Sequence, residues 1–206
     1  MDRCVIISAG KIEDYNSTKK LINKNDVIVC ADGGYIHAKN MGLKVDCVIG
    51  DFDSSKEPET ENKIVLPVEK DVTDTFYCVD EYTKKGYKNF LILGCLGGRF
   101  DHSYSNVLLL KYLLKNGCNA VLQDESNKIY LIEENEKTIK FSDFRNISFF
   151  AFDSEVKDLN IINAKYNLSD YDLKTEDSLC ISNSFVDNKD ITIKKQSGIL
   201  LAIESK

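Results

Sequence analysis

The chain has 206 residues, of which 43 % are hydrophobic, and its 27 basic and 33 acidic side chains give a formal charge of −6. This composition is typical of a globular protein, and the length favours one or two domains. An acidic chain without a basic tract is unsuited to nucleic acid or to an anionic membrane surface, because both need clustered lysine or arginine. No apolar run approaches a signal peptide or the roughly 20 residues that span a bilayer. The sequence therefore predicts a soluble cytoplasmic protein without nucleic-acid or membrane partners.

Cysteine and arginine usage narrows the search for functional residues. The seven cysteines lie mostly inside apolar runs and include no C-x-x-C pair of the type that binds zinc or forms a redox dithiol, so we expect buried thiols. Only three of the 27 basic residues are arginine, and one of them, Arg99, stands inside a glycine cluster. Arg99 is therefore a candidate for a specific role.

Residues 1–125 alternate short β-rich apolar runs with longer segments of helical period. This alternation indicates βαβ units around a mostly parallel, Rossmann-like sheet. Amphipathic helices are predicted over Thr73–Lys85 and Ser103–Lys115, and Val107, Leu110 and Leu114 form the expected buried stripe of the second. The predicted buried strands are Cys4–Ala9, Val27–Ala31, Val45–Ile49, Ile64–Leu66, Phe90–Leu93 and Ala120–Leu122.

Residues 126–206 have a different pattern, without a long helical stripe. Short runs with a period near two are separated by Asn, Asp, Ser and Gly, which favours a small antiparallel β-sandwich. The predicted strands are Lys128–Ile132, Asn146–Phe152, Val156–Ile162, Ser178–Ser182, Asp190–Lys194 and Gly198–Ile203. The expected fold class is thus α/β plus all-β, with the domain boundary near Asp124–Asn127.

Four polar or glycine-rich clusters follow predicted strands of the first domain. They are Ala31–Gly34, Gly50–Ser54, Lys70–Asp74 and Gly94–His102. Ligands bind outside the carboxyl ends of the strands in open α/β sheets, so we expect these clusters to converge although they are far apart in the sequence.

The aspartates predict a cation site. Asp51 and Asp53 project to the same side of an extended backbone and repel each other unless a positive charge lies between them. Magnesium binds a few carboxylate oxygens together with substrate phosphates, so this pair suggests a nucleotide metal; an ordinary turn with solvated acids is the alternative. Asp71 and Asp74 precede or begin a predicted helix. A structural role is one interpretation, with Asp71 as the cap of that helix. In the other interpretation, Asp71 or Asp74 completes the metal site.

The segment Gly94–His102 has the parts of a phosphate cradle. Its glycines allow close backbone approach to an anion, the following helix offers free N–H groups, and Arg99 supplies a planar fork for phosphate oxygens. The alternative is a strand-to-helix turn in which Asp101 caps the helix. For His102, a structural donor in the first helical turn is favoured over a proton acceptor or a phosphate ligand. Asp32, Gly33 and Gly34 either bring backbone against a nucleotide or form a simple turn.

The motifs A-D-G-G, G-D-F-D-S, K-D-x-T-D and G-G-R-x-D-H occur in this order over about residues 30 to 102, ahead of an all-β tail. Together they resemble the thiamine pyrophosphokinase (thiamine diphosphokinase) family, and Ser182–Phe185 resembles the S-N-x-F segment of that family. The resemblance implies transfer of a diphosphate from ATP to the hydroxyethyl group of thiamine, with release of AMP. It also implies magnesium and a homodimer whose active site is shared between the α/β domain of one subunit and the β domain of the other.

The resemblance also implies roles for individual residues. The magnesium cluster would be Asp51, Asp53 and Asp74, with Asp71 close by and with Arg99 completing the catalytic set. Thiamine would contact Ser182, Asn183 and Phe185. The nucleotide would lie against Asp32, Gly33, Gly34, Thr73, Gly97, Gly98, Arg99, Asp101 and His102. The first domain, residues 1–125, would bind nucleotide and metal, and the second, residues 126–206, would bind thiamine.

Three rival functions remain at the level of the sequence. A pyrophosphokinase acting on a hydroxymethylpterin shares the metal and nucleotide apparatus but needs a different alcohol site. A phosphohydrolase releases phosphate without an acceptor alcohol. A non-catalytic nucleotide-binding sensor forms no AMP when thiamine is added.

Overall fold

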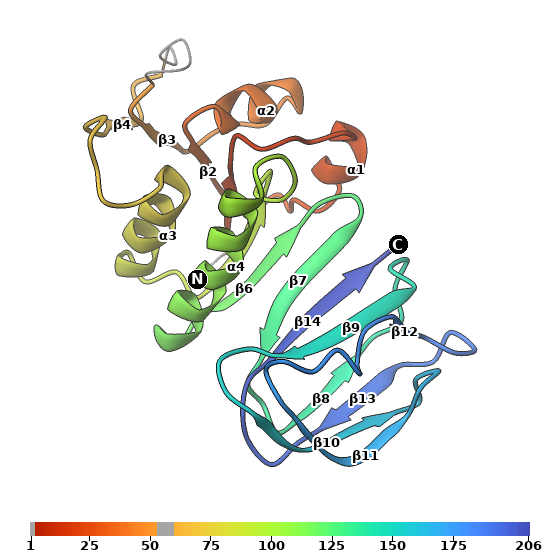
Figure 1. Cartoon of the computed structure of the whole chain (residues 1–206). Coiled ribbons are helices and arrows are strands. Elements are labelled where there is room, and N and C mark those ends of the chain that lie inside the picture. The colour runs from red at the N-terminus through yellow and green to blue at the C-terminus, as the bar shows by residue number, and fades with distance from the viewer. Residues whose placement is uncertain (1–2, 53–59) are drawn as a thin grey trace. The chain divides into compact units, whose positions relative to one another are not determined.

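The computed structural model describes residues 3–52 and 60–206, and the chain divides into two compact units, Met1–Glu125 and Ser126–Lys206 (Figure 1). We call them the N-terminal and the C-terminal unit. Within the described ranges, no helix is both long and apolar enough to cross a membrane.

A parallel sheet forms the centre of the N-terminal unit. Its strands pair in the order β4-β3-β2-β1-β5-β6. The chain moves outward from β1 through β4 and then returns to the other side of β1 with β5. The order therefore reverses between β1 and β5, which is the point where open α/β sheets bind ligands. The bounds are β1 (Cys4–Ile7), β2 (Val27–Ala31), β3 (Cys47–Gly50), β4 (Lys63–Val65), β5 (Asn89–Leu93) and β6 (Asn119–Gln123).

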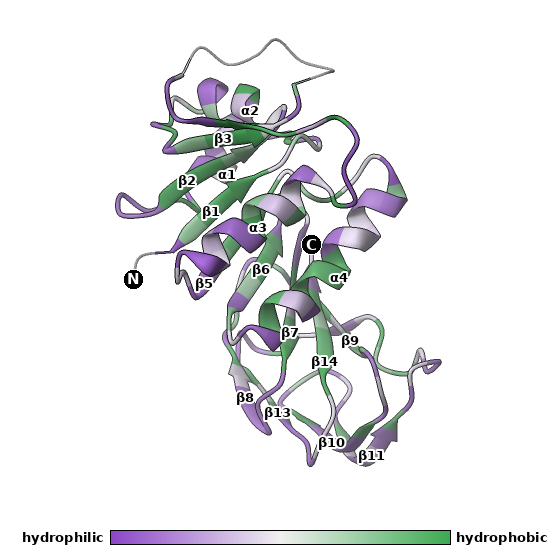
Figure 2. Cartoon of the chain, turned by 90° about the vertical axis from the view of Figure 1, so that its left-hand side faces the viewer, coloured by the Kyte–Doolittle hydropathy of each residue, from purple (hydrophilic) through white to green (hydrophobic). Residues whose placement is uncertain are grey.

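Helices cover both faces of this sheet (Figure 2). The first two pack on the face formed by Val5, Ile7 and Cys30, and the last two pack on the opposite face. Alternate strand residues point to opposite faces, so both faces need apolar side chains, which explains the nearly continuous apolar runs. The helices are α1 (Tyr15–Lys19), α2 (Gly34–Asn40), α3 (Asp74–Lys84) and α4 (Phe100–Lys115).

The two longer helices confirm the predictions from helical period, with corrections in detail. Thr73 caps α3, because its hydroxyl accepts a hydrogen bond from the Phe76 N–H at 3.2 Å, so the expectation that Asp71 caps the helix is wrong. Helix α4 begins at Phe100, three residues before the predicted start, and its inward stripe is Asn106, Leu109, Leu110 and Leu113. Val107 and Leu114 are only half-buried, because the polar Asn106 takes an inward position.

The C-terminal unit consists of two antiparallel sheets, in the orders β12-β9-β14-β7 and β11-β10-β13-β8. Their inner faces share one core, in which Phe149, Ile147 and Ala202 of the first sheet meet Leu159 and Ile193 of the second. The predicted sandwich is confirmed. The bounds are β7 (Asn127–Ile132), β8 (Glu136–Ile139), β9 (Asn146–Ala151), β10 (Val156–Ile162), β11 (Leu168–Leu173), β12 (Asn183–Ser184), β13 (Ile191–Lys194) and β14 (Leu200–Ser205).

Three predictions for the C-terminal unit are corrected. The strand predicted over Ser178–Ser182 is wrong, because Leu179–Ser182 forms turns and Ser182 has a φ of +58°; only the short β12 follows. Cys180 is buried there between two exposed apolar neighbours. This alternation of buried and exposed residues resembles that of a strand, although the segment is a turn. The sequence analysis did not predict β8 and β11, since both lie at the edges of their sheet and carry polar side chains.

Candidate active site

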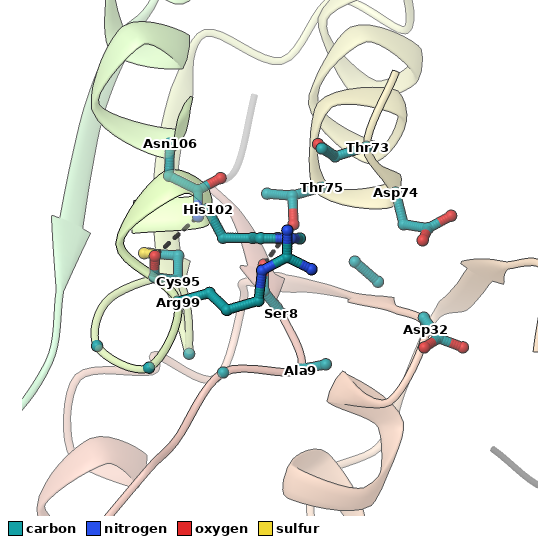
Figure 3. A pocket seen from close by; sticks show the side chains of 15 residues that line it. Ser8, Ala9, Asp32, Thr73, Asp74, Thr75, Cys95, Arg99, His102 and Asn106 are labelled. Carbon is teal, nitrogen blue, oxygen red and sulfur yellow. Dashed lines mark hydrogen bonds between the residues drawn. The ribbon is translucent and has the colours of Figure 1, made fainter. Parts of the chain in front are cut away.

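A cavity of about 430 Å³ lies at the carboxyl ends of β1, β2 and β5, at the point where the strand order reverses. Figure 3 shows Arg99 and His102 on the side of the glycine-rich loop, with Asp32 and Asp74 on the other side. Three of the four predicted clusters thus converge on one cavity. Its lining is Ser8, Ala9, Gly10, Ala31, Asp32, Thr73, Asp74, Thr75, Gly94, Cys95, Gly97, Gly98, Arg99, His102 and Asn106.

The loop after β5 needs its glycines. Gly94 has a φ of +60°, and a Cβ there would lie 2.4 Å from the carbonyl oxygen of Ser8, so a side chain would separate the ends of β1 and β5. Gly97 and Gly98 also have positive φ, at +77° and +64°, which other residues rarely adopt. The loop therefore presents bare backbone to the cavity immediately before α4 begins.

Buried polar side chains that the sequence analysis missed hold this loop and the cavity floor. The side-chain amide of Asn106 donates a hydrogen bond to the Cys95 carbonyl at 2.7 Å. The hydroxyls of Ser8 and Thr75 share a hydrogen bond of 2.8 Å and tie the end of β1 to the start of α3. Two signals point to them: Ser8 directly follows a strand, as the recognised clusters do, and Asn106 interrupts the apolar stripe of a helix.

Next to Asp74, which lines the cavity, a lysine lies between two aspartates; Lys70 and Asp51 are not themselves among the lining residues. Lys70 Nζ contacts Asp51 Oδ2 and lies 3.1 Å from Asp74 Oδ1. Asp74 Oδ1 is buried, and within the described residues it has no partner with hydrogen-bond geometry. Burial raises the pKa of Asp74, and the charges of Asp51 and Asp32 add to this effect against the opposing effect of Lys70. Burial lowers the pKa of Lys70, but its contacts with Asp51 and Asp74 outweigh burial and leave that pKa above its usual value.

The structure describes only part of the predicted metal cluster. Asp53 lies outside the described residues. Asp71 is exposed and does not line the cavity. Among residues 3–52 and 60–206, no three His, Cys, Asp or Glu side chains gather in a way that could hold a metal ion. The structure therefore brings together Asp51 and Asp74, with Lys70 between their carboxylates.

Arg99 pairs with an acid two residues along the chain. Its Nε and Nη2 donate to the two carboxylate oxygens of Asp101, at 3.1 and 2.5 Å, and both side chains are exposed. These contacts lower the pKa of Asp101. Asp101 lies in the first turn of α4 and accepts from the His102 N–H at 3.0 Å, so the alternative in which it caps the helix is wrong; Arg99 holds the cap position, without a side-chain bond.

The other nucleotide candidates have different positions. Asp32 follows β2 directly and adopts a φ of +44°, with its N–H donating to the Ile49 carbonyl at 2.8 Å. Gly33 and Gly34 are not among the cavity-lining residues. A Cβ on Gly34 would lie 1.9 Å from the carbonyl oxygen of Ile7, so this glycine allows α2 to pack closely against β1.

The three thiamine candidates lie together in the C-terminal unit. The Asn183 side chain is buried and bonded to the backbone of Tyr166 in both directions, at 2.9 and 2.7 Å. The Ser182 N–H donates to the Ser148 hydroxyl at 3.0 Å. The Phe185 ring meets Phe141 edge-on, with ring centroids 5.6 Å apart. Asn183 thus ties the segment Ser182–Phe185 to the backbone of Tyr166. The Phe185 side chain is half-buried.

Comparison with known proteins gives matches over both units. The family profile described as the thiamin pyrophosphokinase catalytic domain matches residues 18–122, and the profile of the vitamin B1 binding domain matches residues 128–200. A thiamine pyrophosphokinase of Bacillus subtilis (strain 168) is 31 % identical over 182 residues, which cover 84 % of this chain and 85 % of that protein. Thiamin pyrophosphokinase 1 of Caenorhabditis elegans is 23 % identical over 215 residues, or 98 % of this chain and 88 % of that protein.

Solved structures of similar proteins agree with these matches. The crystal structure of thiamine pyrophosphokinase from Bacillus subtilis superimposes with a TM-score of 0.90 at 26 % identity, covering 100 % of this chain and 99 % of that one. The thiamin pyrophosphokinase from Geobacillus thermodenitrificans gives 0.84 at 23 % identity, covering 99 % and 97 %, and supports the fold. Because the two family profiles together span most of both units, the chain belongs to the thiamin pyrophosphokinase family.

Proposed function

We propose that the chain transfers a diphosphate from ATP to the hydroxyethyl group of thiamine, and that the cavity of the N-terminal unit binds the ATP. The observation that carries the cavity assignment is the convergence of the glycine-rich loop, Arg99, Asp32 and Asp74 on one cavity at the reversal point of the sheet. Bare backbone and a guanidinium suit phosphate oxygens. The family membership of the chain supports the reaction itself.

The reaction needs positioning and charge stabilisation more than covalent chemistry by the protein. The thiamine hydroxyl oxygen attacks the β-phosphorus of ATP, and the bond from that phosphorus to the oxygen bridging to the α-phosphate breaks. AMP leaves with that oxygen, and the hydroxyl proton passes to the solvent. Negative charge develops on the oxygens around the β-phosphorus and on the leaving group. The N–H groups at the start of α4 and Arg99, once it turns from Asp101, are placed to stabilise that charge.

We propose that Asp51 and Asp74 hold a magnesium ion, with Asp53 as the third ligand that the family resemblance implies. The described residues fit such an ion: two carboxylates already share one cationic group, and Asp74 Oδ1 is buried without a hydrogen-bond partner among them. One or two carboxylates together with substrate phosphates form a usual magnesium site. When bound, the ion would neutralise phosphate charge. Asp71, exposed and ahead of α3, would act only on the electrostatics of this region.

We assign the remaining nucleotide contacts to Asp32, Thr73, Gly97, Gly98 and His102, which line the cavity. Asp101 acts by holding the Arg99 guanidinium until phosphate takes its place. Gly33 and Gly34 act by allowing close backbone packing next to Asp32. In the C-terminal unit, Phe185 offers an aromatic face suited to the cationic, aromatic thiamine. Ser182 adds a polar group there, and Asn183 positions the segment through its bonds to Tyr166.

We further propose a homodimer with a shared active site. Phe100, Tyr104 and Leu108 form an exposed apolar stripe at a spacing of four residues along α4, next to the candidate site. A stripe of this type is typical of a surface that another protein covers. The seven buried free thiols are in keeping with a reducing compartment, and we propose a cytoplasmic location.

Mixing two inactive variants tests the shared site. Chains with Asp74→Asn and chains with Phe185→Ala should each be inactive alone and regain activity after subunit exchange. At random pairing about half of the dimers are heterodimers, and each contains one intact site, so about a quarter of all sites are active. No recovery after confirmed exchange of folded chains would mean that each chain builds its own site.

A further inference from the structure

One lysine lies where a cation between two aspartates would lie. Lys70 Nζ contacts Asp51 and is 3.1 Å from Asp74, and the three side chains are only 15 %, 11 % and 23 % exposed. Lys70 lies four residues before Asp74, the first residue of α3, and Asp51 directly follows β3. The ammonium thus joins two acids that lie far apart in the sequence.

Charge explains why a lysine is needed between these two aspartates before a ligand binds. Asp51 and Asp74 contact the same ammonium, so their carboxylates lie close together and repel each other. Lys70 offsets this repulsion. The contact with Asp74 lacks hydrogen-bond geometry, because Asp74 Oδ1 has no such partner among the described residues. A contact of this type depends on charge and little on direction, so another cation can replace the ammonium.

We propose that Lys70 is a built-in counterion, which holds Asp51 and Asp74 together before ligands bind and is exchanged for the magnesium that arrives with ATP. This inference rests on the proposed metal role of the two aspartates. Two cations close together between the same carboxylates repel strongly. The flexible four-carbon stem of lysine allows the ammonium to turn away, and the phosphates of ATP give it a new partner.

The exchange makes metal and nucleotide binding cooperative. A metal ion alone must displace Lys70 without offering the ammonium another anion, so it binds weakly. A metal ion together with nucleotide supplies the phosphate oxygens, so it binds well. The affinity of each ligand should therefore rise when the other is present, and by the same factor for both.

Manganese binding to the full chain tests the exchange. The dissociation constant of Mn²⁺ is measured by electron paramagnetic resonance with and without α,β-methylene-ATP, whose α–β bridge cannot be cleaved in the reaction. In Lys70→Met, Mn²⁺ alone should bind about tenfold more tightly, since a like charge near the ion has gone. The enhancement by the analogue should shrink by a similar factor. Lys84→Met is the matched control, because Lys84 also pairs with an acid four residues away on α3 but is 70 % exposed.

Stability gives a second readout. In EDTA, Lys70→Met should unfold at a lower temperature than the unaltered chain, because Asp51 and Asp74 lose the Lys70 ammonium, and Mn²⁺ should remove this difference. If Lys70 has only a structural role, Lys70→Met should bind Mn²⁺ more weakly or as before, and it should lose stability that Mn²⁺ does not recover. Either result overturns the inference. Lys70→Gln should behave in the same direction and replaces Lys70→Met if that variant does not fold.

Asp74→Asn separates this inference from the proposed metal site. Loss of Mn²⁺ binding in Asp74→Asn supports the site, and unchanged binding overturns the site and the counterion role together. If Asp74→Asn loses Mn²⁺ while Lys70→Met fails to gain affinity, the metal site stands and the counterion exchange is wrong.

Discussion

Asn106 on helix α4 donates a hydrogen bond of 2.7 Å to the carbonyl oxygen of Cys95, in the loop that follows β5. Asn106 is only 8 % exposed and lies on the inward stripe of the helix. The bond fixes the distance between the helix and the loop that carries Gly97 and Gly98. The shape of the proposed phosphate site therefore depends on one amide.

Asn106→Ala should loosen this loop. The Cys95 carbonyl would lose its partner in a buried position, so we expect the free energy of unfolding to fall by about 1–3 kcal/mol. We also expect KM for ATP to rise more than kcat falls. Denaturant unfolding and steady-state kinetics check both. Asn116→Ala is the matched control, because Asn116 donates to the Tyr112 carbonyl at the exposed end of the same helix. Equal effects in the two variants would count against a specific role for Asn106.

Asp74→Asn should abolish product formation and stabilise the metal-free protein at neutral pH. Burial raises the pKa of Asp74, so the native state binds the proton more tightly than the unfolded state. The stability of the unaltered chain then falls as the pH rises above about 4 and through the folded pKa, and the loss persists at higher pH. Asp74→Asn does not lose stability in this way, so the two proteins should be equally stable below about pH 4. Thermal unfolding in EDTA across this range checks the sign; a less stable variant at pH 7 would contradict it.

Arg99→Lys should lose most activity without a change in stability. Lysine keeps the charge but not the fork that now engages both oxygens of Asp101. The pair is exposed, so the unfolding temperature should stay the same. Kinetics with ATP as the varied substrate measures the effect. Retention of most activity would mean that Arg99 contributes charge alone and that its geometry is unimportant.

Glu204→Leu should destabilise the C-terminal unit. The Glu204 side chain is fully buried and accepts hydrogen bonds from Lys128 and Tyr130 at 2.9 Å and from Ser142 at 2.9 Å. The substitution leaves three donors without their acceptor, and we expect a loss of about 3 kcal/mol, the lower end for a broken buried pair because Lys128 is partly exposed. Lys140→Met, which removes an exposed pair with Asp190, is the control and should change little. Similar unfolding curves for both variants would contradict the role of Glu204.

Elements with a regular hydrophobic period could be predicted from the sequence. Features that depend on contacts between residues far apart in the sequence could not. The strands β2 and β10 match their predicted bounds, because their apolar side chains alternate or run continuously into a core. The position of their clusters directly after predicted parallel strands predicted that Asp32, Asp74 and Arg99 would converge, and they line one cavity. The role of Lys70 was not visible, because a lysine next to an aspartate in sequence gives no sign of the second carboxylate, contributed by Asp51 after another strand.

The fate of each phosphate of ATP tests the central claim most directly. The full chain is incubated with magnesium, thiamine and ATP carrying label on the β-phosphate or, separately, on the α-phosphate. Diphosphate transfer predicts that the β label appears in thiamine diphosphate, that the α label appears in AMP, and that the two products form in equal amounts only when thiamine is present. Formation of ADP, release of labelled phosphate without thiamine, or transfer to a hydroxymethylpterin in preference to thiamine would contradict it.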